Sequence, residues 1–219
     1  MSGVNMKTDK REHIIDTAEN LMTRISDKDI SVSMIAQEAG IAKGSIYYYF
    51  NSKEEIIYAV IERAYRNALH EYFDKINPEL SSVEKIRELF YSMIKKEFEG
   101  NQANVILSLH ISEDMLTHNY IKQVAILEIS PVLEKLLIQG MEEGVVYTEI
   151  PKESAEMIVA VLTFFLDGTI FSDDVQTYNK LKLFAKVLDT SLNAKPGTFN
   201  FLFDKSIYME LKQTGDDTE

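Results

Sequence analysis

Residues 31–53 read SVSMIAQEAGIAKGSIYYYFNSK, and this stretch decides the fold of the first quarter of the chain. Ser31 is a suitable N-cap for a short helix that reaches Ala39, because a serine side chain accepts a hydrogen bond from a free amide at a helix start. Gly40 can adopt the left-handed conformation that a tight turn between two helices requires. A second short helix is expected over residues 42–48. The pattern predicts a helix-turn-helix.

The apolar and polar side chains of this motif fall on opposite sides. The apolar ones can pack against the preceding helix, and they are Ile35, Ala36, Ala39, Ile41, Ile46 and Phe50. The second short helix exposes Lys43, Ser45, Tyr47 and Tyr48. Hydroxyl and ammonium groups can donate hydrogen bonds to phosphate oxygens, and Gly44 removes a side chain where the backbone must approach closely. The exposed side therefore predicts contact with DNA.

The spacing of apolar residues is helical along nearly the whole chain, with no convincing period-two alternation. We predict helices over residues 7–25, 53–76, 82–99, 102–117, 119–143, 152–171 and 174–193, and a short final helix within 199–212. Pro131 is expected to kink or break the fifth of these. The sequence predicts an all-α fold, with a three-helix head over residues 1–50, a larger helical body over 51–213 and a disordered polar tail over 214–219.

The net charge of −12 does not by itself favour a role with nucleic acid. Residues 1–55 have 7 Lys and Arg against 9 Asp and Glu, whereas residues 56–219 have 16 against 26. The acidity therefore belongs mostly to the body, and a near-neutral head can still bind phosphates through a few cations. The absence of cysteine excludes disulfides and a thiol nucleophile. No stretch of about 18 apolar residues is present, so we expect no membrane span and a cytoplasmic protein.

Residues 35–56, IAQEAGIAKGSIYYYFNSKEEI, closely resemble the DNA-binding head of the TetR family of bacterial and archaeal regulators. Residues 153–168, ESAEMIVAVLTFFLDG, are similar to that family's first dimerisation helix. The resemblance implies a homodimeric regulator that acts as a repressor and binds double-stranded DNA at a palindromic operator. It further implies release by a small apolar or amphipathic effector bound in the body.

The resemblance also implies which residues contact DNA: Ser33, Lys43, Gly44, Ser45, Tyr47, Tyr48, Tyr49 and Lys53. Lys43 and Ser45 would face the major groove. Lys53 would hold a phosphate together with the positive N-terminus of the long helix. For Tyr49, a half-buried aromatic position between the motif and the body explains the residue equally well. Because the head has no positive excess, binding is expected to be sensitive to salt.

Two apolar helices near the C-terminus are expected to pair with their copies in a second subunit as a four-helix interface. The residues expected there are Ile158, Val161, Leu162, Phe165, Leu181, Phe184 and Leu188. Body residues that could line an effector cavity are Tyr65, Tyr91, His110, Met115 and Phe164, although core packing also explains them.

Other functions find less support in the sequence. His110, Glu113 and His118 have one-turn spacing, but a polar patch at a helix junction explains them better than a metal site. No catalytic triad, nucleotide-binding glycine loop or carboxylate pair stands out, so we expect neither an enzyme nor a cofactor. The main alternative is a dimeric helical protein that binds a small molecule or a partner and whose head does not read DNA specifically. A third hypothesis is a metal-dependent enzyme built around His110.

Overall fold

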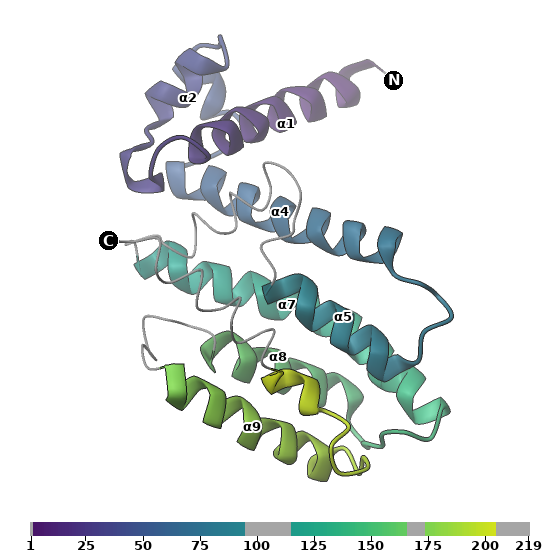
Figure 1. Cartoon of the computed structure of the whole chain (residues 1–219). Helices are drawn as coiled ribbons and strands as arrows, with labels where there is room; N and C mark the ends of the chain where they lie inside the picture. The colour runs from purple at the N-terminus through teal and green to yellow at the C-terminus, as the bar shows by residue number, and fades with distance from the viewer. Residues whose placement is uncertain (1, 95–114, 166–173, 205–219) are drawn as a thin grey trace. The chain divides into compact units, whose positions relative to one another are not determined.

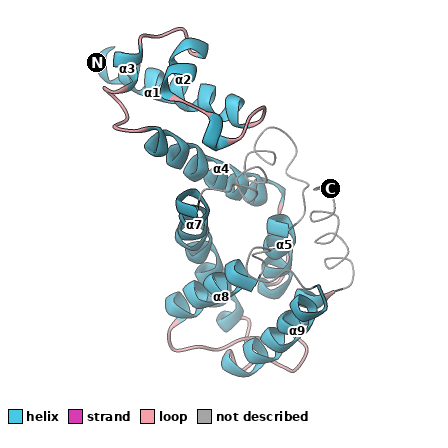
Figure 2. Cartoon of the chain, turned by 90° about the vertical axis from the view of Figure 1, so that its left-hand side faces the viewer, coloured by secondary structure: helices cyan, strands magenta, loops and turns pink. Residues whose placement is uncertain are grey.

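A computed structural model of the chain describes residues 2–94, 115–165 and 174–204. These residues form helices, turns and loops without a strand, so the prediction of an all-α fold is confirmed (Figures 1 and 2). The chain divides into two compact units. The first contains Met1–Ala68 and Phe98–Val124, and the second contains Leu69–Glu97 and Ala125–Glu219.

The first unit is built around one hydrophobic cluster. Its elements are α1 (Ser2–Met22), the 3₁₀ turn η1 (Asp27–Asp29), α2 (Val32–Glu38), α3 (Lys43–Ile46), the first part of α4 (Lys53–Lys75) and the first turns of α7 (Met115–Glu142). Each of the five helices contributes an isoleucine that is at most 1% exposed: Ile14, Ile35, Ile46, Ile56 and Ile121. This shared core holds α2 and α3 against α1, as burial of apolar surface drives folding.

The helix-turn-helix has the predicted turn chemistry. Ser31 Oγ accepts a hydrogen bond from the Met34 amide at 3.2 Å, and Gly40 has a φ of 65°. The predicted extent of the second short helix was too long, because α3 ends at Ile46. The carbonyl of Ile46 then accepts from the amides of both Tyr49 and Phe50, which closes the segment with a turn.

The second unit contains α5 (Ser82–Ile94), the rest of α7, α8 (Pro151–Phe165), α9 (Asp174–Ser191) and the 3₁₀ turn η2 (Asn200–Phe203). Of the predicted kink or break at Pro131, the break was wrong, since α7 continues through Pro131 as one helix with this residue exposed, and the kink stays a prediction. Pro131 lacks an amide hydrogen, and on an exposed side of a helix water can satisfy the carbonyl left without a partner. The helix predicted over residues 102–117 lies mostly outside the described residues, as does most of the final one.

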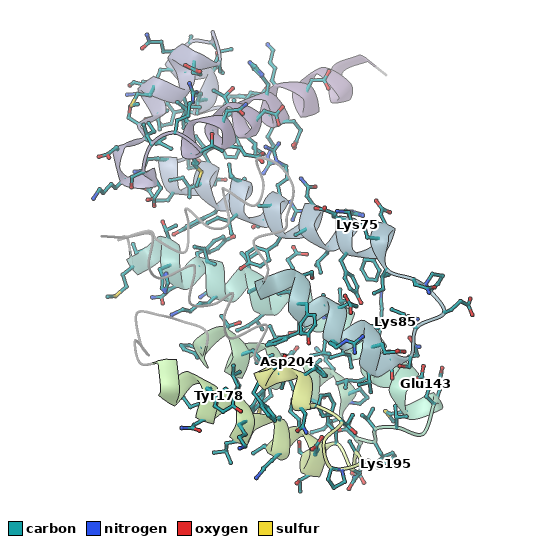
Figure 3. All side chains as sticks on the ribbon, in the orientation of Figure 1. Lys75, Lys85, Glu143, Tyr178, Lys195 and Asp204 are labelled. Carbon is teal, nitrogen blue, oxygen red and sulfur yellow. The ribbon has the colours of Figure 1, made fainter. Side chains whose placement is uncertain are left out.

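The junction of α5 and α7 depends on a close approach of the two chain segments. A Cβ atom on Gly140 would come within 2.7 Å of Val146 Cγ2 and 2.9 Å of Ser82 Oγ. The Glu143 carboxylate accepts hydrogen bonds from the Ser82 amide at 3.0 Å and the Ser82 hydroxyl at 2.7 Å. Glu143 thus caps the start of α5 from the end of α7 (Figure 3 labels Glu143 and Lys85 here).

Glu143→Gln is expected to lower the free energy of unfolding by about 0.5–1 kcal/mol near neutral pH, a value reduced for solvent exposure. The hydrogen bond from the Ser82 hydroxyl is the main cause that lowers the pKa of Glu143 below its ordinary 4.5. A carboxylate whose folded pKa is lowered stabilises the fold above the unfolded pKa, and this contribution is lost as pH falls through the folded pKa. Urea unfolding at neutral and at acidic pH measures the free energy of unfolding of the wild-type chain and of Glu143→Gln.

The matched control is Glu142→Gln, which removes the neighbouring exposed carboxylate. We expect no such pH-dependent loss from the control. An equal effect of both substitutions would show that the Ser82–Glu143 pair has no specific role.

Candidate nucleic-acid interface

The segment from α2 through α3 exposes most of the residues predicted to contact DNA. The exposed ones are Ser33, Lys43, Gly44, Ser45, Tyr47 and Tyr48, with Tyr47 at 49% and Tyr48 at 67%. On the inner side of the segment, Ile46 and Phe50 pack into the core of the first unit, since their side chains are 0% and 1% exposed. Figure 2 shows α3 beside α2 and α1. The arrangement presents hydroxyl and ammonium groups to an external ligand and keeps the apolar groups inside.

Sequence reasoning missed two residues on this surface. Met34 is 37% exposed, and Gln37 is exposed one turn after Ser33. The i, i+4 spacing of Ser33 and Gln37 is the signal that could have identified the second of them, because residues four apart share one helix face. An amide side chain can read the edge of a base.

Gly44 lies on the exposed side of α3. A Cβ atom built there meets no heavy atom within 4 Å, and Gly44 does not have a left-handed backbone. Packing against the described residues therefore gives no reason for a glycine at this position. A close approach of DNA to the α3 backbone at Gly44 stays a prediction.

Tyr49 differs from the two tyrosines before it. Its side chain is half-buried and packs against the core of the first unit. The rings of Tyr48 and Tyr49 meet edge to face, with centroids 5.0 Å apart. Tyr49 therefore supports Tyr48 from the inner side, and a direct contact of Tyr49 with DNA stays a prediction.

Lys53 is engaged within the chain. Its Nζ donates hydrogen bonds to the carbonyl oxygens of Asp27 at 3.0 Å and Lys28 at 3.4 Å. The start of α4 is thereby tied to the turn η1. Ser52 caps the same helix, since its Oγ accepts from the Glu55 amide at 3.2 Å. In return, the Glu55 carboxylate accepts a hydrogen bond from the Asn51 amide, as in a variant of the capping box.

Lys53→Met is expected to destabilise the first unit by about 1–2 kcal/mol, because two carbonyl oxygens lose a charged donor. Lys43→Met is the matched control, as Lys43 is exposed at the start of α3. The control is expected to leave the unfolding free energy unchanged and to weaken DNA binding. Urea unfolding and titration with duplex DNA measure the two effects. Equal stability of the two variants would contradict a structural role for Lys53.

An ion-pair cluster lies between α1 and α4. Arg63 on α4 forms ion pairs with three carboxylates of α1: with Asp16 at 2.6 Å, with Glu12 at 3.4 Å, and with Glu19. The Arg63 side chain is 17% exposed. A charge count over residues 1–55 therefore overstates the acidity of the head, because Arg63 lies beyond that range and partly neutralises three of its acidic groups.

The residues proposed for the effector come from both units. Tyr65 is half-buried against the core of the first unit, and burial raises its pKa. Tyr91 is half-buried in the second unit, 6.5 Å from the ring of Phe201. Met115 and Phe164 are 75% and 46% exposed. His110 lies outside the described residues, so the effector site stays a prediction.

The residues predicted for dimerisation mostly pack within their own chain. Ile158, Leu162, Leu181, Phe184 and Leu188 are each at most 8% exposed, and Val161 is half-buried. The side chain of Phe165 lies outside the described part of the chain. The exposed apolar residues of α8 and α9 are different ones: Met157 at 69%, Phe164 at 46%, Leu183 at 64% and Val187 at 48%.

Two kinds of feature are absent from the described residues. They contain no group of three His, Asp or Glu side chains that could hold a metal ion, and of the suspected set only His118 falls among them. Among the same residues, no helix combines the length and apolar character needed to cross a membrane.

The helical fold and the exposed α2–α3 segment are those of a helix-turn-helix protein. Residues 14–60 match the family model of bacterial regulatory proteins of the tetR family, and residues 99–187 match the tetracyclin repressor-like C-terminal domain. Together these matches span more than half of the chain. The chain belongs to the TetR family of DNA-binding transcriptional regulators, as the resemblance implied, and its relatives are regulators rather than enzymes.

Individual relatives extend the likeness along the chain. The HTH-type transcriptional regulator TtgR of Pseudomonas putida is 25% identical over 168 residues, which cover 73% of this chain and 78% of TtgR. The fatty acid metabolism regulator protein of Bacillus subtilis is 22% identical over 191 residues, which cover 85% of this chain and 95% of that protein. The crystal structure of RolR with resorcinol matches with a TM-score of 0.67 at 16% identity, over 92% of this chain and 96% of RolR. The last of these concerns the fold alone.

Proposed function

We propose that the chain is a dimeric repressor that binds a palindromic operator through α2 and α3 and is released by a small apolar or amphipathic effector. The observation that supports DNA binding is a row of exposed side chains on the outer side of the buried Ile46, namely Lys43, Ser45, Tyr47 and Tyr48. Residues 1–50 are proposed as the DNA-binding part and 51–213 as the part for the effector and the dimer. The match of residues 99–187 to the tetracyclin repressor-like C-terminal domain supports a small molecule as the class of effector.

The operator is tested by selecting bound duplexes from a pool of random sequences. An inverted repeat is expected, because a two-fold dimer presents the same recognition surface to two half-sites. Binding should weaken steeply with salt, since phosphate contacts release counterions. Failure to enrich any sequence would favour the alternative, a small-molecule- or partner-binding protein whose head does not read DNA; the acidic charge of the chain is the observation behind that alternative.

The dimer surface is proposed on the exposed sides of α8 and α9. Met157 and Phe164 are seven residues apart, which is two helical turns, and Val161 lies between them. Leu183 and Val187 are one turn apart on α9. Large apolar side chains repeated along one helix face in this way are typical of an interface. A second copy of the chain is the proposed occupant, with the buried residues of α8 and α9 forming the core beneath.

Leu183→Asp is expected to convert the dimer to a monomer, with a rise in the dimer dissociation constant of about 30-fold or more, because a carboxylate would be buried without a partner. Leu127→Asp is the matched control, since Leu127 is also an exposed leucine, at 72% against 64%. Analytical ultracentrifugation over a range of concentrations measures both. A dimer of unchanged strength in Leu183→Asp would exclude this surface.

A further inference from the structure

The first turns of α7 belong to the first unit, which also contains the helix-turn-helix. Ile121 and Val124 are 1% and 3% exposed and lie in the same hydrophobic cluster as Ile35 and Ile46 of the helix-turn-helix. Thr117, one turn before Ile121, is 2% exposed. These residues are more than 60 positions away in sequence from the motif they help to pack.

Tyr120 on α7 contacts α4 at two points. Its ring stacks on Tyr58, with centroids 3.8 Å apart and planes inclined by 18°. Its hydroxyl donates a 2.6 Å hydrogen bond to Glu62 Oε1. A hydrogen bond to an ionised acceptor is short and strong compared with a neutral one. Tyr58 and Glu62 are four residues apart, so both contacts fall on one face of α4.

Another face of α4 is held by α1. Arg63 directly follows Glu62 and pairs with Glu12, Asp16 and Glu19. Successive residues on a helix point about 100° apart, so the two sets of contacts act from different directions. Within the first unit α4 is therefore held from one direction by α1, next to the helix-turn-helix, and from another by α7.

We propose that Tyr120 is a positioning residue that sets the direction of α4 against the helix-turn-helix and so determines which half-site spacing the dimer accepts. The inference rests on the proposed function, because it needs a dimer on a two-part operator. α4 and α7 each contain residues of both units, and Tyr120 joins the two helices within the first unit.

The test compares Tyr120→Phe and Tyr120→Leu with the wild-type chain. Phenylalanine keeps the stack on Tyr58 and loses the bond to Glu62, whereas leucine loses both. The matched controls are Tyr147→Phe and Tyr147→Leu, since Tyr147 is 52% exposed. Affinity is measured for the selected palindrome, for a single half-site, and for palindromes with the half-sites moved apart by single base pairs.

Tyr120→Leu is expected to weaken binding to the palindrome about tenfold, within the usual range of coupling between sites, and to change half-site binding less than about twofold. Its preference among the half-site spacings should become flatter, with Tyr120→Phe intermediate and the Tyr147 variants unchanged. A merely structural role would reduce half-site and palindrome binding together, and that result would overturn the proposal. An unchanged spacing preference in Tyr120→Leu would also overturn it.

The same measurements distinguish a failure of Tyr120 from a failure of the proposed function. If the wild-type chain showed no preference for a palindrome over a half-site, the dimeric operator model would fail, and the inference would fail with it. If the wild-type chain shows that preference and Tyr120→Leu retains it in full, only the role of Tyr120 is refuted.

Discussion

Gly44→Ala is expected to lower the affinity for the operator about 30-fold, a loss of about 2 kcal/mol, as one added methyl group costs in a well-packed contact. The same substitution should leave the free chain at least as stable. A Cβ at this position meets nothing within 4 Å, and alanine gains about 0.5–1 kcal/mol over glycine inside a helix. The expected loss therefore arises only where DNA approaches the backbone of α3.

Gly144→Ala provides the reciprocal control. Gly144 follows the end of α7 with a φ of 69°, and a Cβ atom added there would meet nothing within 4 Å. Alanine at this position should lower stability by about 1–2 kcal/mol through the left-handed backbone and leave DNA affinity unchanged. Fluorescence anisotropy with the selected duplex and thermal unfolding measure both variants. Full affinity of Gly44→Ala would show that α3 does not lie close to DNA.

Arg63→Met should destabilise the first unit by about 2 kcal/mol, a value reduced from that of a fully buried pair because Asp16 and Glu12 are partly exposed. The Asp16 and Glu12 side chains are 60% and 44% exposed, whereas Glu19 is only 14% exposed. Methionine keeps an apolar stem of similar length, so the change removes mainly the charge. Three carboxylates of α1 would then repel one another without a cation between them.

Two measurements identify the charge as the cause. Raising the salt concentration should recover part of the stability of Arg63→Met, because screening weakens the repulsion of the carboxylates. Adding Glu19→Gln to Arg63→Met should also recover part of it, since the least exposed carboxylate is then neutral. Arg87→Ala is the control, as Arg87 is 42% exposed and, among the described residues, forms its ion pair with its neighbour Glu88. A loss that is independent of salt would indicate packing rather than charge.

The sequence predicted local features well. The Ser31 cap, the Gly40 turn and the inward direction of Ile46 and Phe50 all depend on residues within a few positions of one another, and all three are confirmed. The length of α3 was overestimated because Tyr47 and Tyr48 are compatible with a helix. The helix ends in a turn in which the Ile46 carbonyl accepts from the Tyr49 and Phe50 amides.

Features that depend on distant residues could not be predicted. An apolar stripe such as Ile158 and Leu162 does not reveal whether it faces its own core or a second subunit, because burial of apolar surface is favourable in both places. The hydrogen bond of Lys53 to the Asp27 carbonyl in the η1 turn joins positions 26 residues apart. Nothing near Tyr120 in the sequence indicates Tyr58 or Glu62 as its partners, since side-chain contacts between distant helices leave no local pattern.

The shared core of the first unit also limits how this regulator could be recombined with others. A chimera joined at residue 50 would combine α1–α3 with foreign counterparts of Ile56, Ile57 and Ile121, which complete the cluster here. A working exchange of DNA specificity should instead transfer residues 1–68 together with 115–124, or graft only the exposed positions of α2 and α3 onto an intact recipient. The hydrophobic core that supports the helix-turn-helix is thus discontinuous in sequence.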